Sequence, residues 1–186
     1  MKAAVYRGTE QMEIEEMEKP VIQPGTILLK VKACAICGGD LRTFRHGHAA
    51  IKPPIVLGHE TAGEIVEVAD DVTGFQVGER VIVAPGIGCT TCSYCSSGWQ
   101  NMCYSRKTIA HHYNGGFAEY MLIPAGAVRA NNINRIPAEV TYLEASLAEP
   151  LACVLNGQEN MNISLGDTVA VIGAGPIGCM HAEVRS

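Results

Sequence analysis

Short runs of apolar residues, separated by Gly, Pro and Asp, divide the first 130 residues of the chain into strand-length segments. The segments that predict strands are residues 1–8, 26–36, 62–69, 79–85 and 117–124. The steps PG, DD and TG between them are typical of turns. Short strands at this spacing favour an antiparallel barrel or sandwich, since this region lacks the alternation of strands and helices that builds a parallel sheet.

The pattern becomes helical in residues 141–160, where leucines recur every four residues, and it predicts one helix with an irregularity at Pro150. Further on, VAVIGAG (169–175) predicts a short buried strand, and PIGCMHAEV begins a helix. We therefore expect a β-rich catalytic domain over residues 1–155. Residues 156–186 would supply the first strand, turn and helix of an α/β domain.

The composition is that of a globular protein, with 47% hydrophobic and 18% charged residues and a net charge of −5. This mixed charge predicts no binding of nucleic acid or of an anionic membrane. No apolar run approaches the roughly 18 residues of a membrane helix, and the N-terminus lacks the apolar core of a signal peptide. We expect a cytoplasmic protein, in which eight cysteines favour metal binding over disulfides.

Four of the cysteines lie close together in the spacing C-x2-C-x2-C-x7-C, namely Cys89, Cys92, Cys95 and Cys103. Four soft thiolates can enclose Zn²⁺ in a tetrahedron and leave no open position, so we predict a structural zinc site that orders this loop. An iron–sulfur cluster is the alternative, although the ferredoxin spacing places its fourth cysteine three residues on, before a proline.

A second set of metal-binding residue types is scattered along the chain: Cys37, His59, Glu60 and Glu149. Taken singly, each is ambiguous. A lone cysteine after an apolar strand is most often a small buried hydrophobe, a histidine beside glycine is often a turn residue, and a glutamate is usually solvated. Cys34 and Cys153 have only this ordinary interpretation.

The combination of these motifs resembles the zinc-containing medium-chain alcohol and polyol dehydrogenases. The resemblance covers essentially the whole chain and rests on ICGGDLR, LGHETAGEIVEV, DDVTGFQVGERVIV, the four-cysteine loop, GGFAEYMLIP, LAEPLACVLNG and VAVIGAGPIG. It implies a mostly β, GroES-like barrel as the catalytic domain, followed by the incomplete beginning of a Rossmann domain.

The resemblance also implies roles for single residues. Cys37 and His59 match two ligands of a catalytic zinc, and Glu60 matches an acid that ligates the metal or lies just behind it. Glu149 stands where alcohol dehydrogenases have Cys and where the sorbitol- and threonine-dehydrogenase-like branch has an acid, which favours a polyol or secondary alcohol as substrate. Asp40 matches the carboxylate that orients the ligating imidazole.

These ligands would leave one coordination position for an alcohol oxygen, where zinc acts as a Lewis acid and the hydride passes to NAD or NADP. Gly39 departs from the family, which usually has Ser or Thr there as the first proton acceptor. Water or one of three side chains would have to replace that hydroxyl: Thr43, His46 or His48. Exposed loop positions are the ordinary interpretation of these two histidines, and of His111 and His112.

The last motif is G-x-G-x-x-G, formed by Gly173, Gly175 and Gly178 with Pro176 and Ile177 inside it. Between a strand and a helix, this motif predicts binding of a dinucleotide pyrophosphate. The residue that selects NAD or NADP lies about 20 residues beyond the motif, so that choice is not readable from this chain.

We interpret the chain as the N-terminal part of a roughly twofold longer, homo-oligomeric enzyme, since a dinucleotide fold needs a whole sheet, and expect it to be inactive alone. The alternatives are a non-enzymatic zinc-binding module and a zinc-free reductase. Counting bound zinc separates them, with two ions expected for the enzyme, one for the module and none for the reductase.

Overall fold

The computed structural model describes residues 1–164 and 166–184. The chain divides into two compact units, Met1–Ser146 and Leu147–Ser186, which are described separately below. The predicted domain boundary after residue 155 stays a prediction. Within the described residues, no helix is long and apolar enough to cross a membrane.

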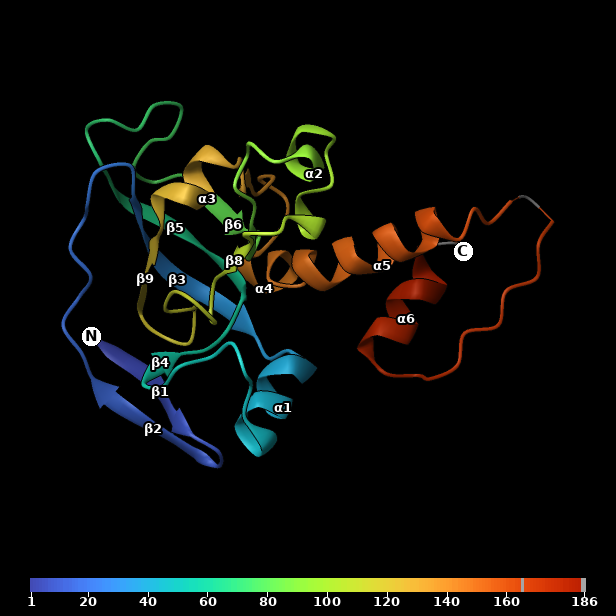
Figure 1. Ribbon diagram of the computed structural model, residues 1–186, viewed down its shortest axis with the longest axis horizontal. Coiled ribbons are helices and arrows are strands. Elements are labelled where there is room, and N and C mark those ends of the chain that lie inside the picture. The colour runs from blue at the N-terminus through green and yellow to red at the C-terminus, as the bar shows by residue number, and fades with distance from the viewer. Residues whose placement is uncertain (165, 185–186) are drawn as a thin grey trace. The chain divides into compact units, whose positions relative to one another are not determined.

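The first unit is built mainly from short strands (Figure 1). Its strands are β1 (Lys2–Gly8), β2 (Gln11–Glu16), β3 (Ile27–Ala35), β4 (Ile55–Val56), β5 (Glu60–Val68), β6 (Arg80–Val83), β7 (Gly86–Ile87), β8 (Lys107–Thr108), β9 (Tyr120–Ile123) and β10 (Ile133–Arg135). Its helices are α1 (Gly38–His46), α2 (Ser93–Ser96), the 3-10 helix η1 (Gln100–Met102), α3 (Ala125–Arg129) and α4 (Tyr142–Ala145). The second unit contains α5 (Ala148–Asn160) and α6 (Pro176–Glu183).

Antiparallel pairing joins the described strands into three sheets, in the orders β10-β6-β5-β3-β9, β2-β1-β4 and β7-β8. Apolar side chains of the large sheet form the main core, with Ile27, Leu29, Ile65 and Met121 almost fully buried. Burial of this apolar area is the chief stabilising contribution to the first unit. The predicted antiparallel, mostly β architecture is confirmed.

Strand β2 was not predicted, because its sequence QMEIEE is rich in acids and reads as a solvated segment. The strand pairs with β1 across its length, and its outward acids are tolerated because it lies at the edge of a sheet. Glu15 accepts two hydrogen bonds from the Arg7 guanidinium, at 2.6 and 2.8 Å.

The prediction of one helix over residues 141–160 is wrong in its detail. Helix α4 ends at Ala145 and α5 begins at Ala148, so the break precedes Pro150. Pro150 lies in the first turn of α5, where a backbone N–H has no partner within the helix and its loss costs little. Thr141 and Glu144 form a capping box that fixes the start of α4.

The predicted strand over residues 169–175 is absent from the described part of the second unit. Ile172 is fully exposed there and Val171 is 45% exposed, so the apolar run is not buried. A parallel strand requires neighbours on its edges and layers on its faces, and residues 147–164 and 166–184 offer it no other strand. The helix that was predicted to follow does form, as α6.

Candidate functional site

Helix α1 begins at Gly38, and Cys37 is its N-cap residue. The Cys37 sulfur accepts a hydrogen bond from the Gly39 N–H at 3.4 Å, and the Asp40 carboxylate accepts one from the Cys37 N–H at 3.0 Å. This reciprocal pair satisfies two N–H groups at the helix start and therefore fixes the Cys37 side chain.

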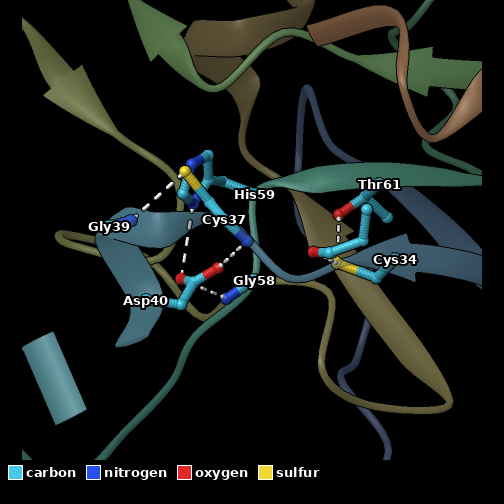
Figure 2. A network of polar contacts seen from close by, with 8 residues as sticks. Cys34, Cys37, Gly39, Asp40, Gly58, His59 and Thr61 are labelled. Atoms are coloured by element: carbon cyan, nitrogen blue, oxygen red, sulfur yellow. Dashed lines mark hydrogen bonds and ion pairs between the residues drawn. The ribbon is translucent and has the colours of Figure 1, made fainter. Parts of the chain in front are cut away.

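Glu60 is the first residue of β5 and His59 immediately precedes it, and the same Asp40 carboxylate reaches toward this segment (Figure 2). One Asp40 oxygen lies 3.5 Å from His59 Nδ1 and accepts a hydrogen bond from the Gly58 N–H at 3.4 Å. Asp40 is only 6% exposed. A carboxylate beside Nδ1 of a histidine orients the ring and leaves Nε2 for a metal, which is the role expected for Asp40.

Only glycine fits at position 58, where the segment before β5 passes close to the Phe117 ring. The φ of Gly58 is +89°, a conformation that favours glycine, and a Cβ atom there would lie 2.5 Å from the Phe117 ring.

The structure brings Cys37, His59 and Glu60 together, with one ligand atom from each within 4.8 Å of the others. Glu60 is 5% exposed, so its carboxylate is held in a largely dry environment that favours pairing with a cation. Sulfur, imidazole nitrogen and carboxylate oxygen are all ligands that zinc accepts, and three of them leave room for a further ligand. This donor set fits zinc.

Glu149, the fourth predicted ligand, lies in the second unit, in the first turn of α5. Its carboxylate accepts a hydrogen bond from the Cys153 thiol at 3.7 Å, and it is not one of the three residues that converge. Its predicted role stays a prediction.

The four cysteines of the loop also converge, with their sulfurs within 4.8 Å of one another. Cys89 and Cys95 sulfurs lie 4.0 Å apart, close to the edge of about 3.8 Å of a tetrahedron with zinc–sulfur bonds of about 2.3 Å. Hydrogen bonds from the Thr91 backbone and hydroxyl lower the pKa of Cys89 to about 6, whereas desolvation raises the pKa of Cys95 to about 11. Four thiolates this close repel one another, so a bound cation stabilises the fully deprotonated set.

The candidate proton carriers near Gly39 lie in different surroundings. His46 is exposed on α1 and His48 is exposed in the loop after it, as the ordinary interpretation expects. His48 also forms a ring pair with the half-buried His111, with centroids 4.6 Å apart, which sequence spacing could not reveal because 63 positions separate them. Thr43 is buried, and its carbonyl accepts a hydrogen bond from the Tyr6 hydroxyl.

Cys34 keeps its ordinary structural interpretation. It lies beside Thr61, with 3.4 Å between the sulfur and the hydroxyl oxygen (Figure 2), and burial raises the pKa of its thiol to about 11. A neutral thiol at physiological pH is a small packed side chain rather than a metal ligand.

Comparison with known proteins decides the family. Residues 23–132 match the alcohol dehydrogenase GroES-like domain. The chain belongs to this family. It is 38% identical to a sorbitol dehydrogenase of Halalkalibacterium halodurans over 187 aligned residues, which cover 99% of the chain and 53% of that protein. The chain spans about half the length of the curated relatives it matches.

Two solved structures extend the comparison. A candidate zinc-binding dehydrogenase from Sinorhizobium meliloti, bound to NADP, superposes with a TM-score of 0.89 at 34% identity and covers 98% of this chain and 52% of that one. A short chain alcohol dehydrogenase from Escherichia coli, complexed with NADH, superposes with a TM-score of 0.89 at 36% identity. The match covers 99% of this chain and 52% of that one. The predicted GroES-like oxidoreductase family is confirmed.

The glycine motif lies outside the matched residues, in the second unit, where the helix of the predicted strand–turn–helix is present and the strand is not. Gly173 has a φ of +112°, and Gly175 is the N-cap of α6, where Pro176 occupies the first turn and Ile177 follows. A Cβ on Gly178 would lie 1.9 Å from the Gly173 carbonyl oxygen, so only glycine fits. This close approach of turn and helix is what the third glycine of the motif allows.

Proposed function

We propose that this chain is the zinc-binding part of an NAD(P)-linked oxidoreductase that acts on an alcohol or polyol. The observation that carries the proposal is the convergence of Cys37, His59 and Glu60 beside Asp40. The names of its relatives, which include sorbitol dehydrogenase and D-altritol 5-dehydrogenase, support a polyol as the substrate class.

In this proposal Cys37, His59 and Glu60 hold the catalytic zinc, and Glu149 is the further acid of the site. When bound, zinc supplies Lewis acidity that lowers the pKa of an alcohol. Asp40 holds the His59 ring in place and, through its bond to the Cys37 N–H, couples both ligands to the start of α1. Gly39 offers no hydroxyl, so the proton must leave through water or a neighbouring side chain.

The remaining parts of the proposal concern stability and the cofactor. The four cysteines from Cys89 to Cys103 would hold a structural zinc, which requires reduced thiols and agrees with a cytoplasmic location. The N–H groups at the start of α6 would meet a dinucleotide pyrophosphate. Since solved relatives contain NADP or NADH, either cofactor fits, and a homo-oligomer of the longer enzyme is part of the same proposal.

Zinc counting tests the proposal. We expect two zinc ions per chain by elemental analysis and one in Cys37→Ser, because the variant loses the thiolate of the three-residue group. Cys179→Ser is the matched control, since its exposed thiol lies outside both groups, and it should retain both ions. Full zinc content in Cys37→Ser would contradict the catalytic site.

A non-enzymatic zinc-binding module is the second candidate, and the missing hydroxyl at Gly39 favours it. The module predicts a single zinc, at the four cysteines. Cobalt substitution distinguishes the two, because cobalt at a site with one thiolate and nitrogen or oxygen ligands has a different absorption spectrum from cobalt at four thiolates. The enzyme proposal predicts the spectra of both cobalt sites in the wild-type chain. In Cys37→Ser it predicts loss of the spectrum of the one-thiolate site and retention of the four-thiolate spectrum.

A further inference from the structure

A cavity of about 790 Å³ lies on the first unit, between the segment that follows α1 and the segment that begins at β8. The polar side chains that line it are those of Lys52, Lys107, His111, His112, Tyr113 and Asn114. Neither of its walls includes a predicted metal ligand. This volume is within the range of small-molecule sites, which is roughly 300–1,000 Å³.

The lining of the cavity favours an anion. It contains two lysines and no carboxylate, and within residues 1–164 and 166–184 neither Lys52 nor Lys107 forms an ion pair. Charges of one sign that have no counter-ion in a concave surface raise the local concentration of ligands of the opposite sign. The lysines are therefore available to a ligand.

Two neutral side chains add hydrogen-bond donors. His112 Nδ1 accepts a hydrogen bond from the Thr108 N–H at 3.1 Å, so the neutral ring carries its proton on Nε2, where it can be donated. The Asn114 carbonyl oxygen accepts a hydrogen bond from the Val56 N–H at 3.0 Å, which leaves the Asn114 amide hydrogens for a ligand. Ammonium, imidazole and amide donors together match the oxygens of a phosphate.

One wall of the cavity, at Asn114, contacts the segment that leads to His59, because Asn114 accepts a hydrogen bond from the Val56 N–H. His111 is half-buried and pairs with His48, and its pKa is lowered to about 4 by burial first and then by the nearby His48 and His59. The Gly116 N–H donates a hydrogen bond to the Gly58 carbonyl at 2.8 Å, so the segment that follows His111 lies beside the residue that precedes His59. A ligand in the cavity would therefore lie close to the segment that carries His59 and Glu60.

We propose that this cavity binds the phosphate group of a phosphorylated polyol, with Lys52 and Lys107 as its charged ligands. The polyol part of this inference rests on the proposed function, whereas the phosphate part rests on the cavity alone. The phosphate would anchor one end of the substrate and leave a hydroxyl group for the zinc site.

Calorimetric titration of the zinc-loaded full chain tests the inference, with inorganic phosphate, sorbitol 6-phosphate and sorbitol as probes. We expect saturable binding of phosphate at one site, weakened by about fivefold or more in Lys52→Gln and in Lys107→Gln. Lys52→Arg should retain binding. Lys30→Gln, an exposed lysine of β3 outside the cavity, should bind within about twofold of the wild type.

The outcomes separate the two proposals. Phosphate binding that depends on the two lysines and persists in Cys37→Ser supports the anion site even if the zinc proposal fails. Binding that disappears in Cys37→Ser and ignores the lysines overturns it, because the phosphate would then contact the metal. Absence of saturable phosphate binding also overturns it. Tighter binding of sorbitol 6-phosphate than of either other probe, lost in both lysine variants, supports the full substrate class.

Discussion

Asp40 contacts three parts of the candidate site at once: the Cys37 N–H, the Gly58 N–H and the His59 ring. A buried carboxylate with several donors is held in one orientation, and it holds its neighbours in turn. The positions of the proposed zinc ligands therefore depend on a residue that need not touch the metal.

Replacing Asp40 by Asn tests this dependence. The amide can still accept from the Cys37 N–H but no longer places a negative charge near His59, so we expect zinc affinity at the three-residue group to fall about 10- to 100-fold. Competition with a chelator measures it. The four-cysteine site should be unchanged, and the exposed Asp70→Asn is the control. Equal affinity in Asp40→Asn would show that Asp40 has no orienting role.

Substitution by alanine should destabilise the protein at one glycine near the site and not at another. Gly58→Ala introduces a side chain at φ +89° and 2.5 Å from Phe117, so we expect a loss of more than about 2 kcal/mol in the free energy of unfolding. Gly39→Ala places a Cβ 3.6 Å from the Cys37 sulfur, an ordinary contact, and should change stability by less than about 1 kcal/mol. Urea denaturation compares them. A large loss in Gly39→Ala would contradict this local geometry.

His111 should make the stability of the protein fall in acid. Burial lowers the pKa of His111 to about 4, below its value of about 6.5 in the unfolded chain. The unfolded state binds more protons between these values, so stability is lost as pH falls from about 6.5 to about 4. Because the ring is only partly buried, we expect about 1 kcal/mol.

The measurement is urea unfolding at pH 7.5 and pH 5 in the presence of zinc. His111→Gln should lose less stability between these values than the wild type, and the exposed His46→Gln should behave like the wild type. Identical pH dependence in all three proteins would exclude His111 as the source.

At the scale of elements, the sequence predicts best where a pattern is local. The alternating apolar segments identify β1, β3, β5, β6 and β9, because burial of one face leaves a period of two residues in the sequence. The acid-rich β2 has no such signal, since its pairing with β1 rather than its composition makes it a strand. The break before Pro150 depends on where a helix starts, which single-sequence patterns locate poorly.

The two candidate metal groups also differ in how local their sequence signals are. The four cysteines lie within one loop, so their spacing alone predicts that they converge. Cys37 and His59 lie 22 positions apart on different elements, so only a family resemblance relates them before the fold is known. The cavity with Lys52 and Lys107 had no sequence signal, because its two lysines lie 55 positions apart and line one cavity only in the folded chain.

The four-cysteine loop should depend on its ion. Cys103 is buried, and its sulfur accepts a hydrogen bond from the Cys89 N–H. Cys103→Ser should lose one zinc per chain and the linked stabilisation, about 2.7 kcal/mol when free zinc is 100-fold above Kd. Hydrogen exchange should accelerate in β7 and β8 and stay slow in the large sheet. Unchanged exchange in β7 and β8 would show that the loop is ordered without metal.

At the scale of the whole molecule, the two units differ in how fully they bury their apolar residues. The first unit has a core of nearly inaccessible side chains, whereas Val169, Val171 and Ile172 of the second unit are exposed. The first strand of a dinucleotide fold is an interior strand, which cannot be stable without its neighbours. The residues that match the GroES-like family, 23–132, all lie in the first unit, which has the buried core.

Limited proteolysis with thermolysin should reflect this difference. We expect the first cuts in residues 166–175, which have exposed apolar side chains and no regular structure, and a resistant fragment that retains residues 1–146. Mass spectrometry of the early fragments identifies the sites. Early cuts inside the five-stranded sheet would contradict the assignment of a stable first unit.

The path of the chain after Cys103 has a consequence for how this protein would respond to its surroundings. Only a few residues separate that cysteine from Lys107, so the four-cysteine loop and the wall of the basic cavity are one continuous segment. If the four cysteines hold zinc and the cavity binds phosphate, as proposed above, a shortage of zinc would also loosen one wall of that cavity. The supply of zinc would then control how tightly the protein holds a phosphorylated ligand.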